Sequence, residues 1–220
     1  MKGMFLAILA AVMLMVFSFS AMAQTSWTGP YIGLNAGYGA GKWDAFNFER
    51  LEQEDVTRLN PKNNKGILGG VEAGYNWMLG NMVFGIVGDF SLSDIDGLRT
   101  YPVDLDEGGT YLSSTKSTLN RLGTLRGRLG YVLGDRILVY GTAGVARAQA
   151  KIVLDWGYPS PDPYSWGRTA NGWVLGYGVE YAVTSRWSGK VEYIRLQMKE
   201  ADYDVVDPFN VIKVGINYHL

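Results

Sequence analysis

The chain has 220 residues, a formal net charge of −1 and no cysteine. This near-neutral balance offers no support for nucleic-acid binding, and without cysteine no disulfide can build the fold. Glycine contributes 29 residues, which is close to twice the ~7% usual in proteins.

The N-terminal segment has the features of a secretory signal peptide. Lys2 gives a basic start, an apolar run covers residues 5–19, and Ala21-Met22-Ala23 forms a small-residue cleavage site. An uncleaved membrane anchor is the competing interpretation, which the cleavage site disfavours. We therefore expect residues 1–23 to be removed and residues 24–220 to form one exported domain. Beyond residue 24 no apolar run reaches the ~18 residues that a transmembrane helix needs.

The first half of the chain predicts three strands, because apolar residues alternate there with small or polar ones. We place these strands at residues 30–43, 67–77 and 82–92, with a polar loop at 42–66 and a short turn at 78–81. The apolar face comprises Ile32, Leu34, Ala36, Tyr38, Ala40, Val71, Ala73, Tyr75, Trp77, Met82, Phe84, Ile86 and Phe90. The opposite face includes Gly33, Asn35, Gly70, Glu72, Gly74, Asn76 and Asp89.

The second half predicts five more strands. They lie at residues 119–131, 137–148, 173–181, 187–193 and 209–220, with short turns at 133–136 and 183–186. Two further segments, 93–118 and 149–169, are predicted as long loops, and residues 199–208 are predicted as a short acidic loop. Both faces of the strand at 137–148 are apolar or small, so the pattern leaves its register undecided.

Together these patterns predict an all-β fold, an eight-stranded antiparallel transmembrane β-barrel. Apolar residues outside and polar residues inside are typical of such barrels, as are short periplasmic turns alternating with four longer extracellular loops. A soluble sandwich also alternates, but its inward face is the apolar one. In this topology, five aromatic residues fall near the periplasmic interface, as a girdle does: Trp77, Tyr131, Tyr181, Trp187 and Tyr218.

Several segments resemble the small outer-membrane β-barrel proteins of the "porin family". They are WTGPYIGLNAGYGAG, GNMVFGIVGDF, GTLRGRLGYVLGDR, GWVLGYGVEYAVTSRWSGKVEY and VIKVGINYHL. The resemblance implies an outer-membrane protein of a Gram-negative bacterium; the family includes major surface antigens and some haem-binding surface proteins. It also implies that the barrel-insertion machinery is a partner during assembly. Family members usually end in an aromatic residue, and Leu220 stands at that place here.

The charges predicted to point into the barrel sum to zero. They are four acids and four bases: Glu72, Asp89, Glu180 and Glu192, with Arg126, Arg128, Lys190 and Lys213. The bore of an eight-stranded barrel is just wide enough for side chains to fill it, and inward glycines such as Gly74 and Gly178 leave room for long charged chains. We interpret the set as a salt-bridged plug. A charged pathway for ions or protons is the alternative.

Catalysis and cofactors find little support in the sequence. His219 is the single histidine, so no Cys/His cluster can hold zinc, and a Ser–His pair would need a serine close to that one ring. The acid pairs Asp94/Asp96 and Asp104/Asp106 are more simply explained as solvated loop charge. We predict that the protein is not an enzyme and carries no cofactor.

Aromatic residues in the third long loop form the best candidate binding surface: Trp156, Tyr158, Tyr164 and Trp166. Surface loops often carry function, and Trp and Tyr are favoured contact residues. The simpler explanation is that these rings pack on one another or enter the outer leaflet. A haem iron ligated by Tyr158 or Tyr164 is a further alternative.

Two arginines, Arg121 and Arg195, are predicted to point outward near the loop ends of their strands. Outer-membrane lipid and lipopolysaccharide are therefore expected partners, since an arginine fork binds phosphate well; snorkelling into water is the alternative. The overall prediction is an integral outer-membrane surface protein with a plugged lumen. A narrow pore for small solutes, and ligand or haem capture or adhesion through the loops, are the alternative functions.

Overall fold

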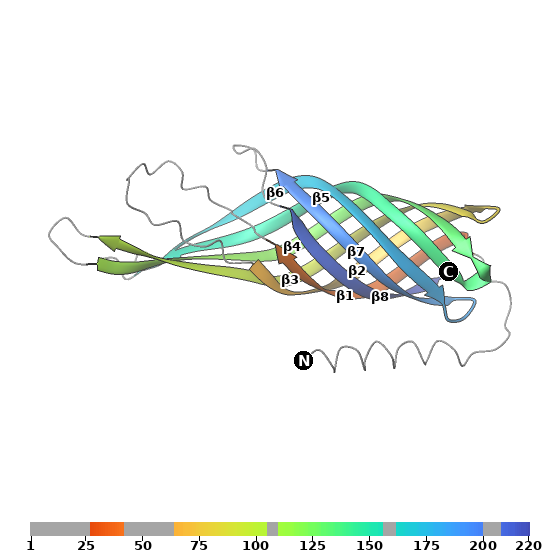
Figure 1. The fold of residues 1–220 in the computed structure, drawn as a ribbon, viewed down its shortest axis with the longest axis horizontal. Helices are drawn as coiled ribbons and strands as arrows, with labels where there is room; N and C mark the ends of the chain where they lie inside the picture. The colour runs from red at the N-terminus through yellow and green to blue at the C-terminus, as the bar shows by residue number, and fades with distance from the viewer. Residues whose placement is uncertain (1–26, 42–63, 105–109, 156–161, 200–207) are drawn as a thin grey trace.

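The structure, a computed structural model, describes residues 27–41, 64–104, 110–155, 162–199 and 208–220 (Figure 1). Within these ranges the chain forms eight strands and one short 3₁₀ helix, η1 (Gly134–Arg136). The strands are β1 (Gly29–Gly41), β2 (Asn64–Leu79), β3 (Met82–Asp104), β4 (Thr110–Leu133), β5 (Ile137–Asp155), β6 (Tyr164–Ala182), β7 (Trp187–Lys199) and β8 (Phe209–His219). No helix in the described part of the chain has the length and hydropathy to cross a membrane.

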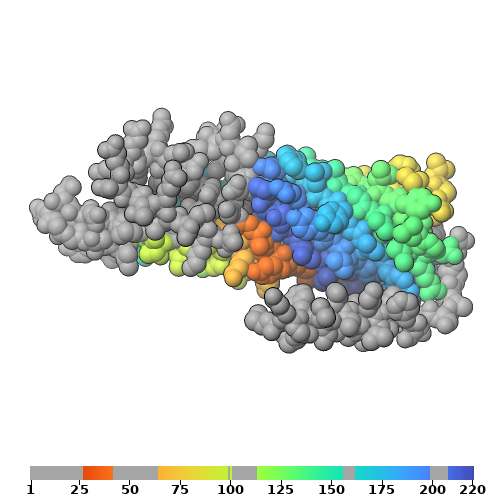
Figure 2. All heavy atoms as spheres, in the orientation of Figure 1, coloured from red at the N-terminus to blue at the C-terminus, as the bar shows by residue number. Residues whose placement is uncertain are grey.

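The eight strands close into a single antiparallel barrel in sequence order. The ring is completed by β1, which pairs with β2 on one side and with β8 on the other, from Tyr31 opposite His219 to Gly41 opposite Phe209. In the space-filling view, β1 in orange lies beside the blue C-terminal strands, of which β8 pairs with it and β7 follows next (Figure 2). The predicted fold class is therefore confirmed.

The predicted short turns are also present. Leu79 pairs with Met82, so only Gly80 and Asn81 form the connection between β2 and β3. The φ of Gly80 is 59°, a left-handed conformation that glycine adopts without steric cost. The chain can therefore reverse its direction within two residues between β2 and β3.

The side chains alternate between the two surfaces as the sequence pattern predicted. Leu34, Val71 and Val179 point outward and are 59%, 54% and 47% exposed. The undecided strand is resolved as well, because Leu138, Tyr140 and the other even-numbered residues of β5 point inward. The sequence could not show this register, since alanine and glycine occur on both faces of β5 and both faces carry apolar residues.

Four of the strands extend well beyond the lengths expected for them. β3 has 23 residues and β4 has 24, whereas a tilted strand crosses a membrane in about 9–11. Residues 93–104, 110–118, 149–155 and 164–169, predicted as loops, are therefore strands. The polar composition of these segments suggested loops. Strands that extend into water beyond a membrane can, however, be polar on both faces. Figure 1 shows the ribbon of β3 and β4 reaching far past the ends of β1, β7 and β8.

A β-bulge at Asn120 separates the two parts of β4. The register shifts there relative to both β3 and β5. On the barrel side of the bulge the even-numbered residues point inward, as Leu122 does, whereas beyond it the odd-numbered ones do, as Leu119 does. The extra residue thus exchanges the two faces of the strand.

The buried charges occupy the middle of the barrel, and an apolar cluster, which the sequence pattern did not predict, lies in the interior on either side of them. One apolar cluster lies towards the end of the barrel from which β3 and β4 extend. It comprises Leu68, Ile95, Leu119, Leu122, Ala146, Ala148, Ala170, Val174, Ile194, Leu196, Met198, Phe209 and Val211. Towards the short-turn end lies a second cluster of Trp27, Val83, Val132, Leu138, Tyr140 and Ala182. The pattern missed these layers because their members are inward residues of strand segments predicted as loops, of the undecided strand, or of strand ends.

Candidate functional site

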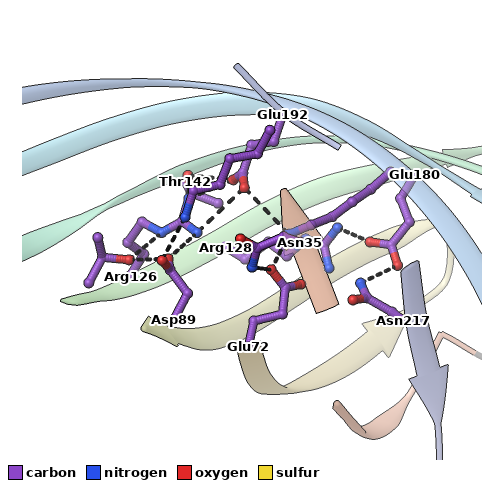
Figure 3. A network of polar contacts seen from close by, with 12 residues as sticks. Asn35, Glu72, Asp89, Arg126, Arg128, Thr142, Glu180, Glu192 and Asn217 are labelled. Carbon is purple, nitrogen blue, oxygen red and sulfur yellow. Dashed lines mark hydrogen bonds and ion pairs between the residues drawn. The ribbon is translucent and has the colours of Figure 1, made fainter. Parts of the chain in front are cut away.

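The buried charges between the two apolar clusters form the candidate site. All eight predicted lumen charges point inward and are at most 6% exposed: Glu72, Asp89, Arg126, Arg128, Glu180, Lys190, Glu192 and Lys213. They come from β2, β3, β4, β6, β7 and β8, so the group joins strands on opposite sides of the ring (Figure 3).

Six of these residues form one continuous chain of ion pairs across the bore. Its order is Glu72, Lys190, Glu192, Arg126, Asp89 and Lys213. Lys190 Nζ lies 2.5 Å from Glu72 Oε2 and 3.4 Å from Glu192 Oε2. The amide of Asn35 also donates to Glu72, at 3.4 Å. This part of the chain ties β7 to β2 and β1.

Arg126 is the centre of the network. Its Nη1 donates to Glu192 at 2.6 Å and its Nη2 to Asp89 at 2.9 Å, so one guanidinium bridges β7 and β3. Thr124 and Thr142 also accept hydrogen bonds from this guanidinium, at 3.0 and 3.1 Å. A planar fork with five donors suits this position, and the shorter, single-headed lysine does not.

Lys213 of β8 is the last residue in this chain of ion pairs. Its Nζ lies 2.7 Å from Asp89 Oδ1 and 3.2 Å from Ser91 Oγ. With three acids and three bases, the six-membered network is neutral. A neutral set in which every charge has an opposite partner is the form in which buried charge is tolerated.

Arg128 and Glu180 form a second neutral unit, nearer to the short turns. Their side chains are ion-paired, and Asn217 and Ser188 donate to the same carboxylate at 2.8 and 2.5 Å. The guanidinium of Arg128 also lies over the ring of Tyr140, with 3.7 Å between Cζ and the ring centroid. Desolvated cation–π contacts of this kind are among the stronger ones.

Inward glycines provide the space for these long side chains. A Cβ at Gly74 would lie 2.5 Å from ring atoms of Tyr31, and a Cβ at Gly178 would lie 2.7 Å from the Tyr140 hydroxyl. Both contacts are closer than real Cβ atoms make, so the two tyrosine rings occupy the volume that a side chain would need.

The single histidine has a serine beside it, which the sequence did not indicate. Ser188 Oγ lies 3.0 Å from His219 Nε2 and 2.5 Å from Glu180 Oε1. A carboxylate only accepts, so the hydroxyl proton goes to Glu180 and the serine accepts from the ring N–H. In a nucleophilic Ser–His pair the serine must instead donate to the ring. Within the described residues, His219 Nδ1 has no partner that could orient the ring for catalysis.

The candidate loop surface is only partly described. Trp156 and Tyr158 lie outside the described residues. Tyr164 and Trp166 belong to β6 and not to a loop, and their ring centroids are 5.4 Å apart. Tyr164 is 65% exposed. The two rings contact each other at the outer end of the barrel.

The two predicted lipopolysaccharide contacts are both exposed but do not share a site. Arg121 does not open its strand, because β4 begins eleven residues earlier, at Thr110. Arg195 lies on β7, three strands further around the ring. Its neighbours across the sheet are Leu175 and Asn210.

Sequence reasoning missed the neutral partners of the charges. Thr142 and Tyr140 lie on the strand whose register was undecided, and Tyr31 directly follows the predicted strand start at Pro30. Their inward parity was the one available signal. Among the described residues, no group of three His, Cys, Asp or Glu side chains is arranged to hold a metal ion.

Comparison with known proteins finds relatives along nearly the whole chain. The family model described as "Outer membrane protein beta-barrel domain" matches residues 9–219. The 31 kDa outer-membrane immunogenic protein of Brucella melitensis is 34% identical over 99% of both chains. The 22 kDa outer membrane protein of Rhizobium leguminosarum is 31% identical over 82% of this chain and 68% of its own length.

Solved structures with a similar fold are more distant in sequence. The attachment invasion locus protein of Yersinia pestis is 13% identical, with a TM-score of 0.47 over 88% of this chain and 99% of that one. Neisserial surface protein A is also 13% identical, with a TM-score of 0.46 over 88% and 98%.

Proposed function

Because the chain belongs to the outer membrane protein beta-barrel domain family and is an integral protein of the bacterial outer membrane, we propose that it is a sealed, non-conducting surface and envelope protein. The observation that carries this proposal is the layered filling of the bore. The neutral charge network lies between two apolar clusters, so a permeating ion would meet three barriers in series.

Each layer opposes conduction for a different physical reason. Apolar constrictions exclude water, which removes the hydration that an ion needs. The central charges are held in ion pairs of 2.5 to 3.4 Å, so entry of an ion would require breaking buried pairs. The narrow-pore alternative needs a continuous wet path, and none of these layers supplies one.

Planar-bilayer recording tests the proposal. Purified protein refolded into lipid should give no steady conductance steps, while a large-pore porin added to the same bilayer verifies the recording. Incorporation is established beforehand by flotation of the proteoliposomes. Stable, weakly selective openings of the wild-type barrel would overturn the sealed-barrel proposal in favour of transport.

The long β3–β4 ribbon supports a second role, presentation of protein surface outside the cell. The Brucella melitensis relative is named an outer-membrane immunogenic protein, and we propose that this chain is exposed at the cell surface. The connection at residues 105–109 would then face the medium, whereas the Gly80–Asn81 turn would face the periplasm.

Epitope tags at these two places test the orientation. A tag within residues 105–109 should bind antibody on intact cells. A tag at Gly80–Asn81 should bind only after the outer membrane is permeabilised. Labelling of the second tag alone on intact cells would mean that the barrel is inserted the other way round.

We further propose that the protein catalyses no reaction at Ser188 and His219. The hydrogen bond from Ser188 to Glu180 holds the hydroxyl in the wrong direction for attack, and the serine is only 2% exposed. A fluorophosphonate probe should leave wild type and Ser188→Ala equally unlabelled. Labelling of wild type that disappears in Ser188→Ala would establish a nucleophilic serine.

A further inference from the structure

Three bases form a cluster on the outward face of β4 and β5. Arg121, Arg147 and Lys151 are all exposed. Gln149 pairs with Arg121 across the two strands, and Arg147 and Lys151 flank Gln149 on the same face. Diagonal neighbours of this kind are about 7–8 Å apart, within reach of long side chains. One multivalent anion can therefore contact all three residues, which we call the β4–β5 basic cluster.

No acid in the described part of the chain neutralises the cluster. Among the described residues, none of its three members makes an ion pair, whereas the nearby Lys116 lies 3.3 Å from Asp96. The nearest outward acid on β3, Asp94, forms no ion pair with the cluster either within the described ranges. On the β6 side, the residues opposite Arg147 and Lys151 are Asn171 and Gly167.

The cluster lies at the border of the lipid-facing surface. Arg121 pairs with Leu92 of β3, which is 60% exposed. Val145, also 60% exposed, precedes Arg147 by two residues, and Leu125, 61% exposed, follows Arg121 by four. The apolar outer surface of β4 and β5 thus ends where the bases begin. A charge at the membrane midplane would be costly, but that cost falls towards zero near the interface.

The bulge at Asn120 is what aims Arg121 at this border. In the outer part of β4 the odd-numbered residues point inward, so without the face exchange Arg121 would point into the barrel. Bulges that re-aim a single side chain are common next to functional positions.

We propose that the β4–β5 basic cluster binds the phosphate groups of a phosphorylated glycolipid in the outer leaflet. The two guanidinium forks can each take a phosphate in bidentate geometry, and the lysine adds a point charge. The neighbouring leucine and valine side chains then lie against the acyl chains of the same lipid. The inference rests on the orientation in the proposed function. Arg195 is not part of this site, since its cross-strand neighbours are uncharged.

Titration of the refolded barrel with lipid A tests the proposal. The variant Arg121→Gln/Arg147→Gln/Lys151→Gln is compared with Lys65→Gln/Arg186→Gln/Arg195→Gln, which removes the same charge from exposed residues elsewhere. Binding is measured by native mass spectrometry and by the shift in Tm. Lipid A with both phosphates, dephosphorylated lipid A and inorganic phosphate are the three ligands. A charge-conserving variant, Arg121→Lys/Arg147→Lys, separates loss of binding from loss of folding.

Wild type and the control variant should bind bisphosphorylated lipid A alike, with a clear rise in Tm. The cluster variant should bind it at least about tenfold more weakly, and the lysine variant should fall between them. Dephosphorylated lipid A should bind wild type and cluster variant equally weakly. Equal binding of phosphorylated lipid by wild type and cluster variant would overturn the proposal. So would the same Tm shift from inorganic phosphate, because the lipid would then not be the ligand. A conducting barrel would refute the sealed-barrel function without changing this titration.

Discussion

Arg128 and Tyr140 lie face to face inside the barrel, with the guanidinium Cζ 3.7 Å from the centroid of the ring. The same guanidinium is ion-paired with Glu180, so one side chain joins the charged middle layer to the apolar layer beneath it. The contact unites residues from β4, β5 and β6, and its loss should be felt by all three strands.

Arg128→Met should therefore lower the free energy of unfolding by about 3–5 kcal/mol, because Glu180 is left buried without its cation. Arg128→Lys should cost less, since the charge stays while the stacked fork is lost. The double variant Arg128→Met/Glu180→Gln should recover much of the loss. Urea titration in lipid vesicles measures these values, and strict additivity of the two single substitutions would contradict the coupling.

Gly178→Ala should destabilise the barrel by about 1–3 kcal/mol through crowding of the bore. The new Cβ would lie 2.7 Å from the Tyr140 hydroxyl, so Tyr140→Phe should partly rescue the variant. The rescue is partial because the Val191 carbonyl oxygen is equally close, at 2.6 Å. Absence of any rescue in the double variant would show that the ring does not set the limit.

A substitution at the adjacent residue, Val179, should change contacts with lipid and not the packing inside the barrel. Val179 points outward, opposite Val139 and Val191, so Val179→Arg places a charge against acyl chains. The cost is about 2–4 kcal/mol at the midplane and smaller near an interface. Val179→Leu serves as the neutral control. Full refolding yield and unchanged stability of Val179→Arg would mean that the outward face is not in contact with lipid.

Leu196→Ala should cost more than Leu175→Ala, although both remove the same atoms. Leu196 is 2% exposed and belongs to the same apolar cluster as Leu122 and Phe209. Its replacement by alanine leaves a cavity there and should lower the free energy of unfolding by about 2–5 kcal/mol. Leu175 is 48% exposed on the outer face, where acyl chains can fill the gap. Equal losses in unfolding free energy would indicate that the interior repacks freely.

Much of this architecture could be predicted from the sequence, because a period of two directly reports which face each residue occupies. Glu72 and Lys213 were assigned to the bore on that basis. The partners of each charge could not be predicted, since Arg126 meets Glu192 across the ring, at a sequence separation of 66 residues. The lengths of β3 and β4 were missed because strands outside the membrane lose the apolar face that identifies them.

Processing of the N-terminus is a further testable expectation. Residues 1–23 lie outside the described residues, and we propose that cleavage after Ala23 gives a mature chain starting at Gln24. N-terminal sequencing of the outer-membrane protein should find Gln24. Ala23→Leu should accumulate the precursor, whereas Ala21→Gly, which keeps a small residue at the site, should be cleaved. A mature protein that retains Met1 would contradict the assignment.

The barrel closes only when β8 pairs with β1, so it cannot form without its last strand. All eleven residues of β8, from Phe209 to His219, pair with β1, and ten of them, from Phe209 to Tyr218, also pair with β7. A product of early termination that lacked this strand would hold two open edges, and hydrocarbon offers no water to satisfy them. An incomplete chain of this kind therefore gains no stable position in the membrane, because only the closed ring leaves no strand edge unpaired.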